Sequence, residues 1–118
     1  MHELGIVFHI IKEVDDIAEQ NKVNDVKLVT LEIGEVSGVI PKYVEDCWKW
    51  AVINKSKYMK DCALNIITLK ATSYCEDCRD MYPTVPDGKI CPKCKGKRTY
   101  LVSGNEIEIR DIQVKDND

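Results

Sequence analysis

The 118-residue sequence contains no apolar run that approaches the roughly 20 residues needed to span a bilayer. The start of the chain lacks the charged region, compact apolar region and small-residue cleavage site of a secretory signal peptide. Positive charge is not in excess: the net charge is −3, which argues against a general nucleic-acid-binding protein. Repeats and low-complexity segments are absent. We therefore expect a soluble, cytoplasmic protein that binds neither membranes nor nucleic acids.

Two segments have the apolar spacing of an amphipathic helix. Residues 3–21 carry this spacing at Leu4, Val7, Ile11, Val14 and Ala18, with Ile10 and Ile17 broadening the face. Residues 41–54 carry it at Val44, Cys47, Trp48, Ala51 and Val52. Pro41 suits the first turn of this second helix. With 44% apolar and 31% charged residues, the composition is that of a globular protein with one core.

The remaining regular segments alternate like strands. Residues 26–34 and 62–71 are the first two, and residues 99–114 offer a short strand followed by a longer one. In the longer one, a shift of parity between Ile109 and Ile112 predicts a bulge. Gly34 and Gly38, between the first strand and the second helix, are attributed to turn geometry. The order predicts an α+β fold: two helices on a three-stranded sheet, with an inserted four-cysteine, zinc-ribbon-like module.

Four of the six cysteines form two C-x-x-C pairs with twelve residues between them. These pairs are Cys75/Cys78 and Cys91/Cys94. Two such turns can direct four thiolates at one ion, and a site with four sulfur ligands is typical of closed, structural zinc. We predict a zinc module at about residues 74–99. The other two cysteines, Cys47 and Cys62, are expected to be small buried hydrophobic residues.

Two alternatives to structural zinc stay open for this module: a rubredoxin-like iron site and a ribbon that binds nucleic acid. Its cations are Lys89, Lys93, Lys95, Lys97 and Arg98. Its anions, which largely cancel them, are Glu76, Asp77, Asp80 and Asp87. Three tyrosines, Tyr74, Tyr82 and Tyr100, are expected to pack the thin core of the module rather than stack on bases.

The first residues of the chain offer a second set of metal donors. The Met1 amine, the His2 amide nitrogen and His2 Nδ1 can close two adjoining chelate rings, a planar arrangement that suits Ni²⁺ or Cu²⁺. Glu3 offers an amide or a carboxylate as a further ligand. By residue type alone, a histidine at this position is more often a solvated side chain. His9, the only other histidine, is expected at the boundary of the helix's apolar face.

Four segments occur together in a specific order: MHELGI at the start, LEIGEVSGVIP at 31–41, the cysteine pairs at 75–94 and SGNEIEI at 103–109. This ordered set resembles the HypA/HybF family of hydrogenase nickel-incorporation (maturation) proteins along essentially the whole chain. The resemblance implies a nickel metallochaperone with a nickel-binding α+β domain at 1–73 plus 100–118 and a structural zinc-binding domain at 74–99.

Carried over residue by residue, the resemblance implies that transported Ni(II) is bound by His2, with Met1 and Glu3 as further ligands. It also implies that structural Zn(II) is held by Cys75, Cys78, Cys91 and Cys94. The implied partners are a HypB-type nickel GTPase and the large subunit of [NiFe]-hydrogenase, and in some organisms the urease maturation proteins.

The sequence favours two other classes of function less strongly. A zinc-ribbon nucleic-acid-binding or transcription accessory protein is the alternative, and it requires binding that weakens steeply with salt. An enzyme is not expected, because the sequence offers no evident Ser/His/Asp or Cys/His set and no carboxylate obviously paired with either histidine.

Overall fold

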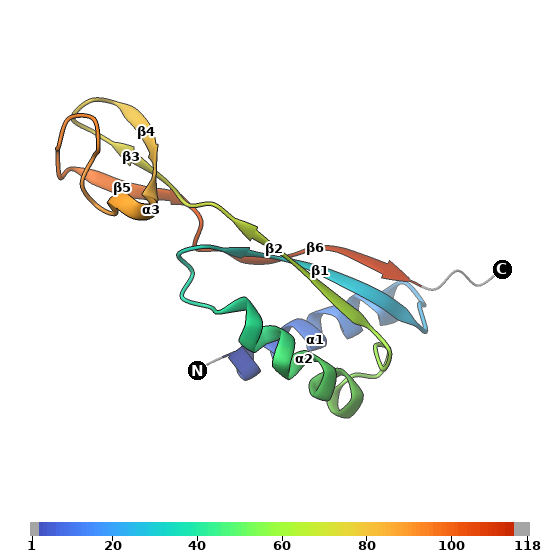
Figure 1. Ribbon diagram of the computed structural model, residues 1–118. Helices are drawn as coiled ribbons and strands as arrows, with labels where there is room; N and C mark the ends of the chain where they lie inside the picture. Colours follow the sequence, from blue (N-terminus) through green and yellow to red (C-terminus); the bar gives the residue numbers. More distant parts are fainter. Residues whose placement is uncertain (1–2, 115–118) are drawn as a thin grey trace. The chain divides into compact units, whose positions relative to one another are not determined.

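The computed structural model describes residues 3–114 of the chain (Figure 1). The elements in order are α1 (Glu3–Gln20), β1 (Val26–Gly34), α2 (Pro41–Lys55), β2 (Ala63–Leu69), β3 (Thr72–Cys75), β4 (Asp80–Pro83), α3 (Thr84–Asp87), β5 (Thr99–Ser103) and β6 (Ile107–Val114). Among these residues, no helix is long and apolar enough to cross a membrane. The predicted α+β class is confirmed.

The chain divides into two compact units. The helical unit comprises Val39–Ile67 and the described parts of Met1–Glu32 and Glu108–Asp118. The cysteine unit comprises Ile33–Gly38 and Thr68–Ile107. These bounds differ from those of the two metal domains expected from the sequence, whose functional division stays a prediction.

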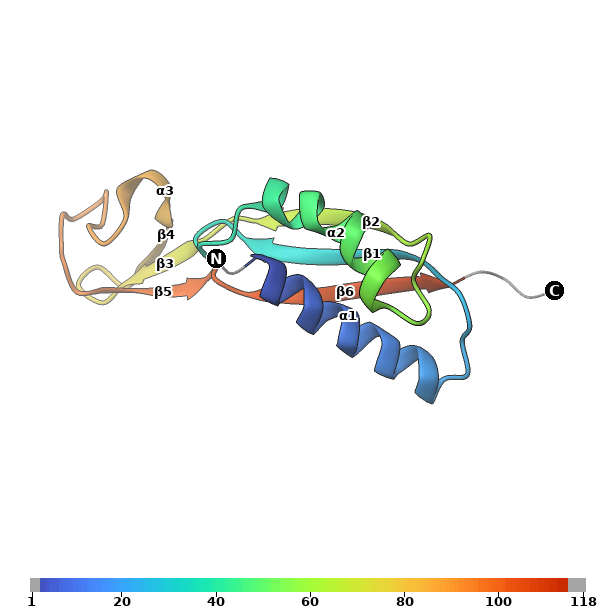
Figure 2. The ribbon, with the colours of Figure 1, turned by 90° about the horizontal axis from the view of Figure 1, so that it is seen from below.

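In the helical unit, α1 and α2 lie side by side on one face of a three-stranded sheet with the order β2-β1-β6 (Figure 2). The helices bury the stripes that the sequence indicated. From α1 the buried residues are Val7, Ile10, Ile11, Val14 and Ala18, and from α2 they are Val44, Trp48, Ala51 and Val52. They pack with strand residues Val26, Val29 and Leu31 to form the core. The expected two helices on a three-stranded sheet are therefore present.

Three residues of the expected helix faces are less buried than predicted. Leu4 and Ile17 are 42% and 41% exposed. At about 100° per residue, the five buried side chains of α1 span an arc of about 100°, and these two lie about 20° beyond its opposite edges. Cys47, expected to be buried, is half-buried on α2, whereas Cys62 is buried as expected.

Asp15 ties α1 to the loop that follows α2. Its carboxylate accepts hydrogen bonds from Ser56 Oγ at 2.8 Å, from the Lys57 backbone N–H at 3.0 Å and from the Tyr58 backbone N–H at 3.3 Å. Because these donors precede β2, the contact helps to position the start of that strand.

The cysteine unit contains a second three-stranded sheet, with the order β4-β3-β5, which the sequence did not predict. In this sheet β3 pairs antiparallel with both neighbours, so that Cys75 lies opposite Asp80 on β4 and Thr99 on β5. The strands β3 and β4 have only four residues each, too few for apolar alternation to be recognised.

Glycine is required at positions 34 and 38 for different structural reasons. Gly38 has a φ of +84°, as expected for a turn glycine. Gly34 ends β1 and opens the turn, since its carbonyl accepts a hydrogen bond from the Ser37 N–H at 3.0 Å. A glycine is needed there for another reason, because a Cβ atom would lie 1.9 Å from the carbonyl oxygen of Gly104. Two close backbone segments therefore exclude a side chain at Gly34. The adjacent Glu35 carboxylate accepts a hydrogen bond from the Ala71 N–H at 2.7 Å, which links two further segments of the unit.

Candidate metal centre

The first cysteine pair lies on the turn between β3 and β4. Cys75 is the last residue of β3, and its partner Asp80 opens β4, so residues 76–79 form the connecting turn that carries Cys78. Arg79 has a positive φ of 59°, which lets the chain reverse directly after the second cysteine. The turn is thus fixed by the strand pairing on either side of it.

The second cysteine pair repeats this local geometry. Lys95 follows Cys94 directly and has a φ of 63°. Its N–H donates to the Cys91 carbonyl at 2.9 Å, and the Cys91 N–H donates to the Gly96 carbonyl at 3.0 Å. In both pairs the left-handed residue stands four positions after the first cysteine, which makes the two turns structural equivalents.

The two turns bring their sulfur atoms together. The Sγ atoms of Cys75, Cys78, Cys91 and Cys94 all lie within 4.8 Å of one another. Cys75 Sγ is 3.5 Å from Cys94 Sγ, and Cys78 Sγ is 3.7 Å from Cys91 Sγ. Four sulfurs bound about 2.3 Å from a zinc ion form a tetrahedron with edges of about 3.8 Å. The donor set and its spacing therefore fit a tetrahedral thiolate-bound metal, and all four cysteines are free thiols rather than disulfides.

A backbone N–H group donates a hydrogen bond to one of the cluster's sulfur atoms and would stabilise its thiolate form. The Gly96 N–H donates to Cys94 Sγ at 3.4 Å. A Cβ atom at Gly96 would lie 3.2 Å from that sulfur and 2.5 Å from Asp77 Oδ2, so a side chain here would crowd both turns. The glycine therefore allows the second turn to fold close against the first.

The thiols of the cluster differ in acidity. Backbone N–H groups, that of Cys94 first and that of Lys93 after it, lower the pKa of Cys91 to about 7 although burial opposes the shift. Loss of surrounding water, followed by hydrogen bonding with the neighbouring thiols, raises the pKa of Cys78 to about 12. The hydrogen bond between Cys78 and Cys91 thus acts in opposite directions on the pKa values of the two thiols.

Several charged side chains around the cluster form ion pairs with one another. Lys93 pairs with Asp80, and Arg98 lies 3.3 Å from Asp77 Oδ1 and 3.4 Å from Glu76 Oε2. Three of the four anions of the module are thus paired with two of its five cations.

Of the three tyrosines expected in the core of this module, only Tyr82 is fully buried, and its hydroxyl donates to the Gly88 carbonyl at 2.7 Å. Tyr100 is 52% exposed, so the prediction that it packs the core is wrong. Its ring instead lies against Tyr74 at the surface, with the two ring centroids 5.4 Å apart.

The second predicted metal site is described only in part. Met1 and His2 lie outside the described residues. Glu3 is the first residue of α1 and is half-buried. His9 is exposed, with its Nε2 3.8 Å from the Glu13 carboxylate. Within residues 3–114, the four cysteines are the only His/Cys/Asp/Glu group with ligand atoms close enough to hold a metal ion.

The chain is similar to known proteins in both sequence and structure. The sequence matches the family described as hydrogenase/urease nickel incorporation, metallochaperone, hypA, over residues 1–114. The hydrogenase maturation factor HypA of Dehalococcoides mccartyi is 30% identical over 116 residues, which cover 98% of this chain and 96% of the relative. That of Actinobacillus succinogenes is 31% identical over 115 residues, 98% of this chain and 100% of the relative. The solution structure of the Ni metallochaperone HypA from Helicobacter pylori has a TM-score of 0.73 at 26% identity, covering 97% of each chain.

Proposed function

Since the chain belongs to the HypA family of hydrogenase/urease nickel-incorporation proteins, we propose that it binds Ni(II) at Met1, His2 and Glu3 and delivers it to [NiFe]-hydrogenase. Family members are metallochaperones and maturation factors rather than enzymes. The observation that carries the proposal is the family match, which extends over the helices, both cysteine turns and the first residues of the chain.

The chemistry of the first residues supports nickel as the cargo. A terminal amine, a backbone amide and an imidazole form a planar nitrogen donor set, which Ni²⁺ accepts. The first N–H groups of a helix have no acceptor within the helix, so the backbone before α1 can exchange its protons for a metal at little structural cost. Protons compete for the amine and the imidazole, so nickel binding weakens as pH falls.

The four cysteines are proposed to hold structural zinc. Four sulfur ligands fill the tetrahedral coordination of Zn²⁺ and leave no open position for exchange. This supports a division of labour in which a domain of residues 1–73 plus 100–118 handles nickel and a domain of residues 74–99 holds zinc. We therefore assign zinc the role of holding together the chain segments that meet at the cluster, and no role in catalysis.

The proposed partners follow from the same premise. A HypB-type nickel GTPase would supply or receive the ion, and the large subunit of [NiFe]-hydrogenase would be its destination, with the urease maturation proteins as a second one in some organisms. Action in the cytoplasm agrees with the six cysteines, none of which forms a disulfide, because disulfides are rare in a reducing compartment.

Nickel titration by calorimetry on zinc-loaded protein tests the nickel site. We expect one equivalent of Ni²⁺ to bind the chain that begins with Met1, and His2→Ala to weaken binding more than about tenfold, because an imidazole ligand is lost. A Gly-Ser extension before Met1 is expected to weaken it likewise. His9→Ala is the matched control, because it removes the other histidine, which is exposed on α1.

Equal affinities for all four proteins would overturn the N-terminal assignment and place nickel elsewhere. If no protein binds nickel and all stay folded by circular dichroism, the zinc-ribbon accessory protein becomes the better description. Salt-dependent binding to nucleic acid would then be the next measurement.

A further inference from the structure

The four cysteines of the metal centre differ in how far they are exposed. Cys75 and Cys91 are fully buried, whereas Cys78 and Cys94 are exposed. Each of the two turns therefore contributes one buried and one exposed sulfur atom. A cysteine is the more readily oxidised the more it is ionised and the more it is exposed. Because a thiol that coordinates a metal ion is deprotonated, the two exposed cysteines meet both conditions when metal is bound.

Each exposed sulfur atom lies against a buried sulfur atom of the other turn. Cys94 Sγ is 3.5 Å from Cys75 Sγ, and Cys78 Sγ is 3.7 Å from Cys91 Sγ. Both separations are below the edge of about 3.8 Å expected for four sulfurs around zinc. A disulfide forms when a thiolate attacks an activated sulfur atom that it can reach. Each exposed cysteine therefore has a buried partner across the cluster that is positioned for this attack.

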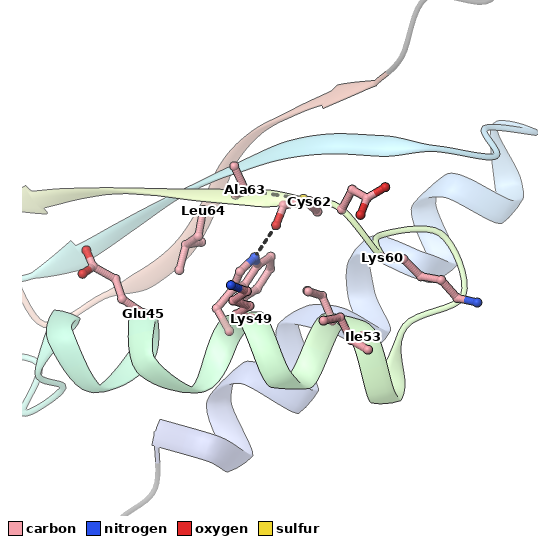
Figure 3. A pocket seen from close by; sticks show the side chains of 10 residues that line it. Glu45, Lys49, Ile53, Lys60, Cys62, Ala63 and Leu64 are labelled. Carbon is pink, nitrogen blue, oxygen red and sulfur yellow. Dashed lines mark hydrogen bonds between the residues drawn. The ribbon is translucent and has the colours of Figure 1, made fainter.

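Cys62 combines the opposite properties. It lies directly before β2, where its Sγ donates to the Ala63 carbonyl at 3.3 Å and its own carbonyl accepts from Trp48 Nε1 at 2.9 Å (Figure 3). This cysteine is buried, and burial raises the pKa of its thiol to about 11. It is therefore protonated as well as shielded at neutral pH, and a mild oxidant should leave it unchanged.

We propose that the cluster is a site of reversible oxidation by hydrogen peroxide, which forms the disulfides Cys75–Cys94 and Cys78–Cys91 between the turns and releases zinc. The proposal rests on the structural zinc site proposed above. An exposed thiolate attacks one oxygen of peroxide, the O–O bond breaks, and hydroxide leaves, which gives a sulfenic acid. The buried thiolate of the other turn attacks this sulfur, the S–O bond breaks, and a second hydroxide leaves. Two electrons thus pass from each pair of thiolates to one molecule of peroxide.

The positions of the disulfides decide whether the cysteine unit stays folded. Bound zinc joins the two turns, and a unit with little apolar core needs either a metal or a disulfide to be stable. Disulfides between the turns replace the link that is lost with zinc, whereas disulfides within the turns leave them separate. We therefore expect the oxidised unit to stay folded without zinc and to bind zinc again after reduction.

Peptide mapping tests the pairing. The full chain is first shown to contain zinc by atomic absorption and is then treated with hydrogen peroxide at neutral pH beside a coloured zinc chelator. After free thiols are blocked, trypsin cuts behind Lys93 and a glutamate-specific protease cuts behind Glu76, which separates the two cysteines of each turn. We expect loss of the bound zinc, linked peptides of the two cross-turn pairs, and an unmodified Cys62.

Cys47→Ser is the matched control, because it removes the half-buried cysteine that lies outside the cluster on α2. It should give the same disulfides and the same loss of zinc. Amide hydrogen exchange then compares the oxidised chain with a reduced chain from which the chelator has removed zinc. Residues 72–103 should stay protected in the oxidised chain and exchange fast in the reduced one. A dithiol reductant and added zinc should restore the starting protein.

Several results would overturn the proposal. These are disulfides within the turns, retention of zinc at a peroxide concentration that oxidises Cys62, and oxidation to sulfinic acid that a dithiol does not reverse. Fast exchange across residues 72–103 in a chain with both cross-turn disulfides would also overturn it, because the disulfides would then not replace the metal. A purified chain that contains no zinc before oxidation would instead overturn the structural zinc assignment on which the proposal rests.

Discussion

The two units of this chain bury very different material. The helical unit has a core of large aliphatic side chains from both helices and its sheet, among them Val7, Val14, Val44 and Leu31, each fully buried. The described buried cluster around the metal centre of the cysteine unit consists of Cys75, Tyr82 and Cys91. One unit is thus stabilised by apolar packing, whereas the other places its ligands where a core would be.

This difference indicates that the two units depend on different conditions. Burial of apolar surface supplies most of the free energy of folding in an ordinary domain. A unit too small to bury enough of it needs a disulfide or a metal instead, and the free energy of metal binding then becomes free energy of folding. The helical unit should therefore be indifferent to chelation, and the cysteine unit should not survive it.

The largest expected effect is the loss of the cysteine unit alone. Cys75→Ala removes one ligand from the end of β3, and the expected cost is most of a structural zinc contribution, about 10 kcal/mol or more. We expect zinc content to fall to background and amide hydrogen exchange to become fast across residues 72–103, while α1 and α2 stay protected. Cys62→Ala replaces a buried free cysteine of the helical unit, and this variant should keep the zinc of the cysteine unit. Retained zinc and retained protection in Cys75→Ala would contradict the comparison.

A substitution in the helical unit should give the reverse result. Leu31 is fully buried in β1, and Leu31→Ala is expected to lower the free energy of unfolding of this unit by about 2–5 kcal/mol, because it leaves a cavity in the core. Thermal unfolding monitored by helical circular dichroism should show the loss, and the zinc content should not change. The same substitution at the exposed Leu4 is the control and should cost much less. Release of zinc from Leu31→Ala would show that the units are not separately stabilised.

The parts of the structure that the sequence predicted are those with strong local signals. In α1 the apolar residues recur over five turns, so the helix and most of its buried face follow from spacing alone. The four-cysteine cluster follows from covalent proximity, because each C-x-x-C pair brings its own two sulfurs together regardless of the fold around them. Only the union of the two pairs depends on tertiary structure.

The parts that the sequence did not predict depend on long-range contacts. The sheet of the cysteine unit needs strands of four residues, whose pairing is visible only once the chain has folded back on itself. Gly34 is required by the carbonyl of Gly104, a residue 70 positions later in the sequence. The position of β2 at the edge of its sheet likewise depends on the strand order, which no local pattern encodes.

The smallest expected effect tests whether the Glu106 carboxylate adds to the stability of the cysteine unit. Hydrogen bonds from backbone N–H groups, that of Gly104 first, lower the pKa of Glu106 below its ordinary value of 4.5. A lowered pKa means that the folded unit favours the carboxylate, so this stabilisation is complete above that ordinary value and is lost as pH falls through the lowered one. Glu106→Gln should therefore lower the thermal midpoint of the zinc-loaded unit slightly at pH 7.

The difference in midpoint between Glu106→Gln and the native chain should shrink as pH falls below the ordinary glutamate value. Because acid releases zinc from both proteins, the effect of zinc loss on the thermal midpoint cancels when the two are compared at the same pH. Glu108→Gln, an exposed carboxyl on β6, is the matched control. A difference that is constant with pH would mean that the charge of Glu106 contributes nothing to the stability of the cysteine unit. A difference that is present at neutral pH and disappears in acid would show that backbone N–H groups around Gly104 stabilise the Glu106 carboxylate. This contribution to the stability of the unit is smaller than that of the metal centre.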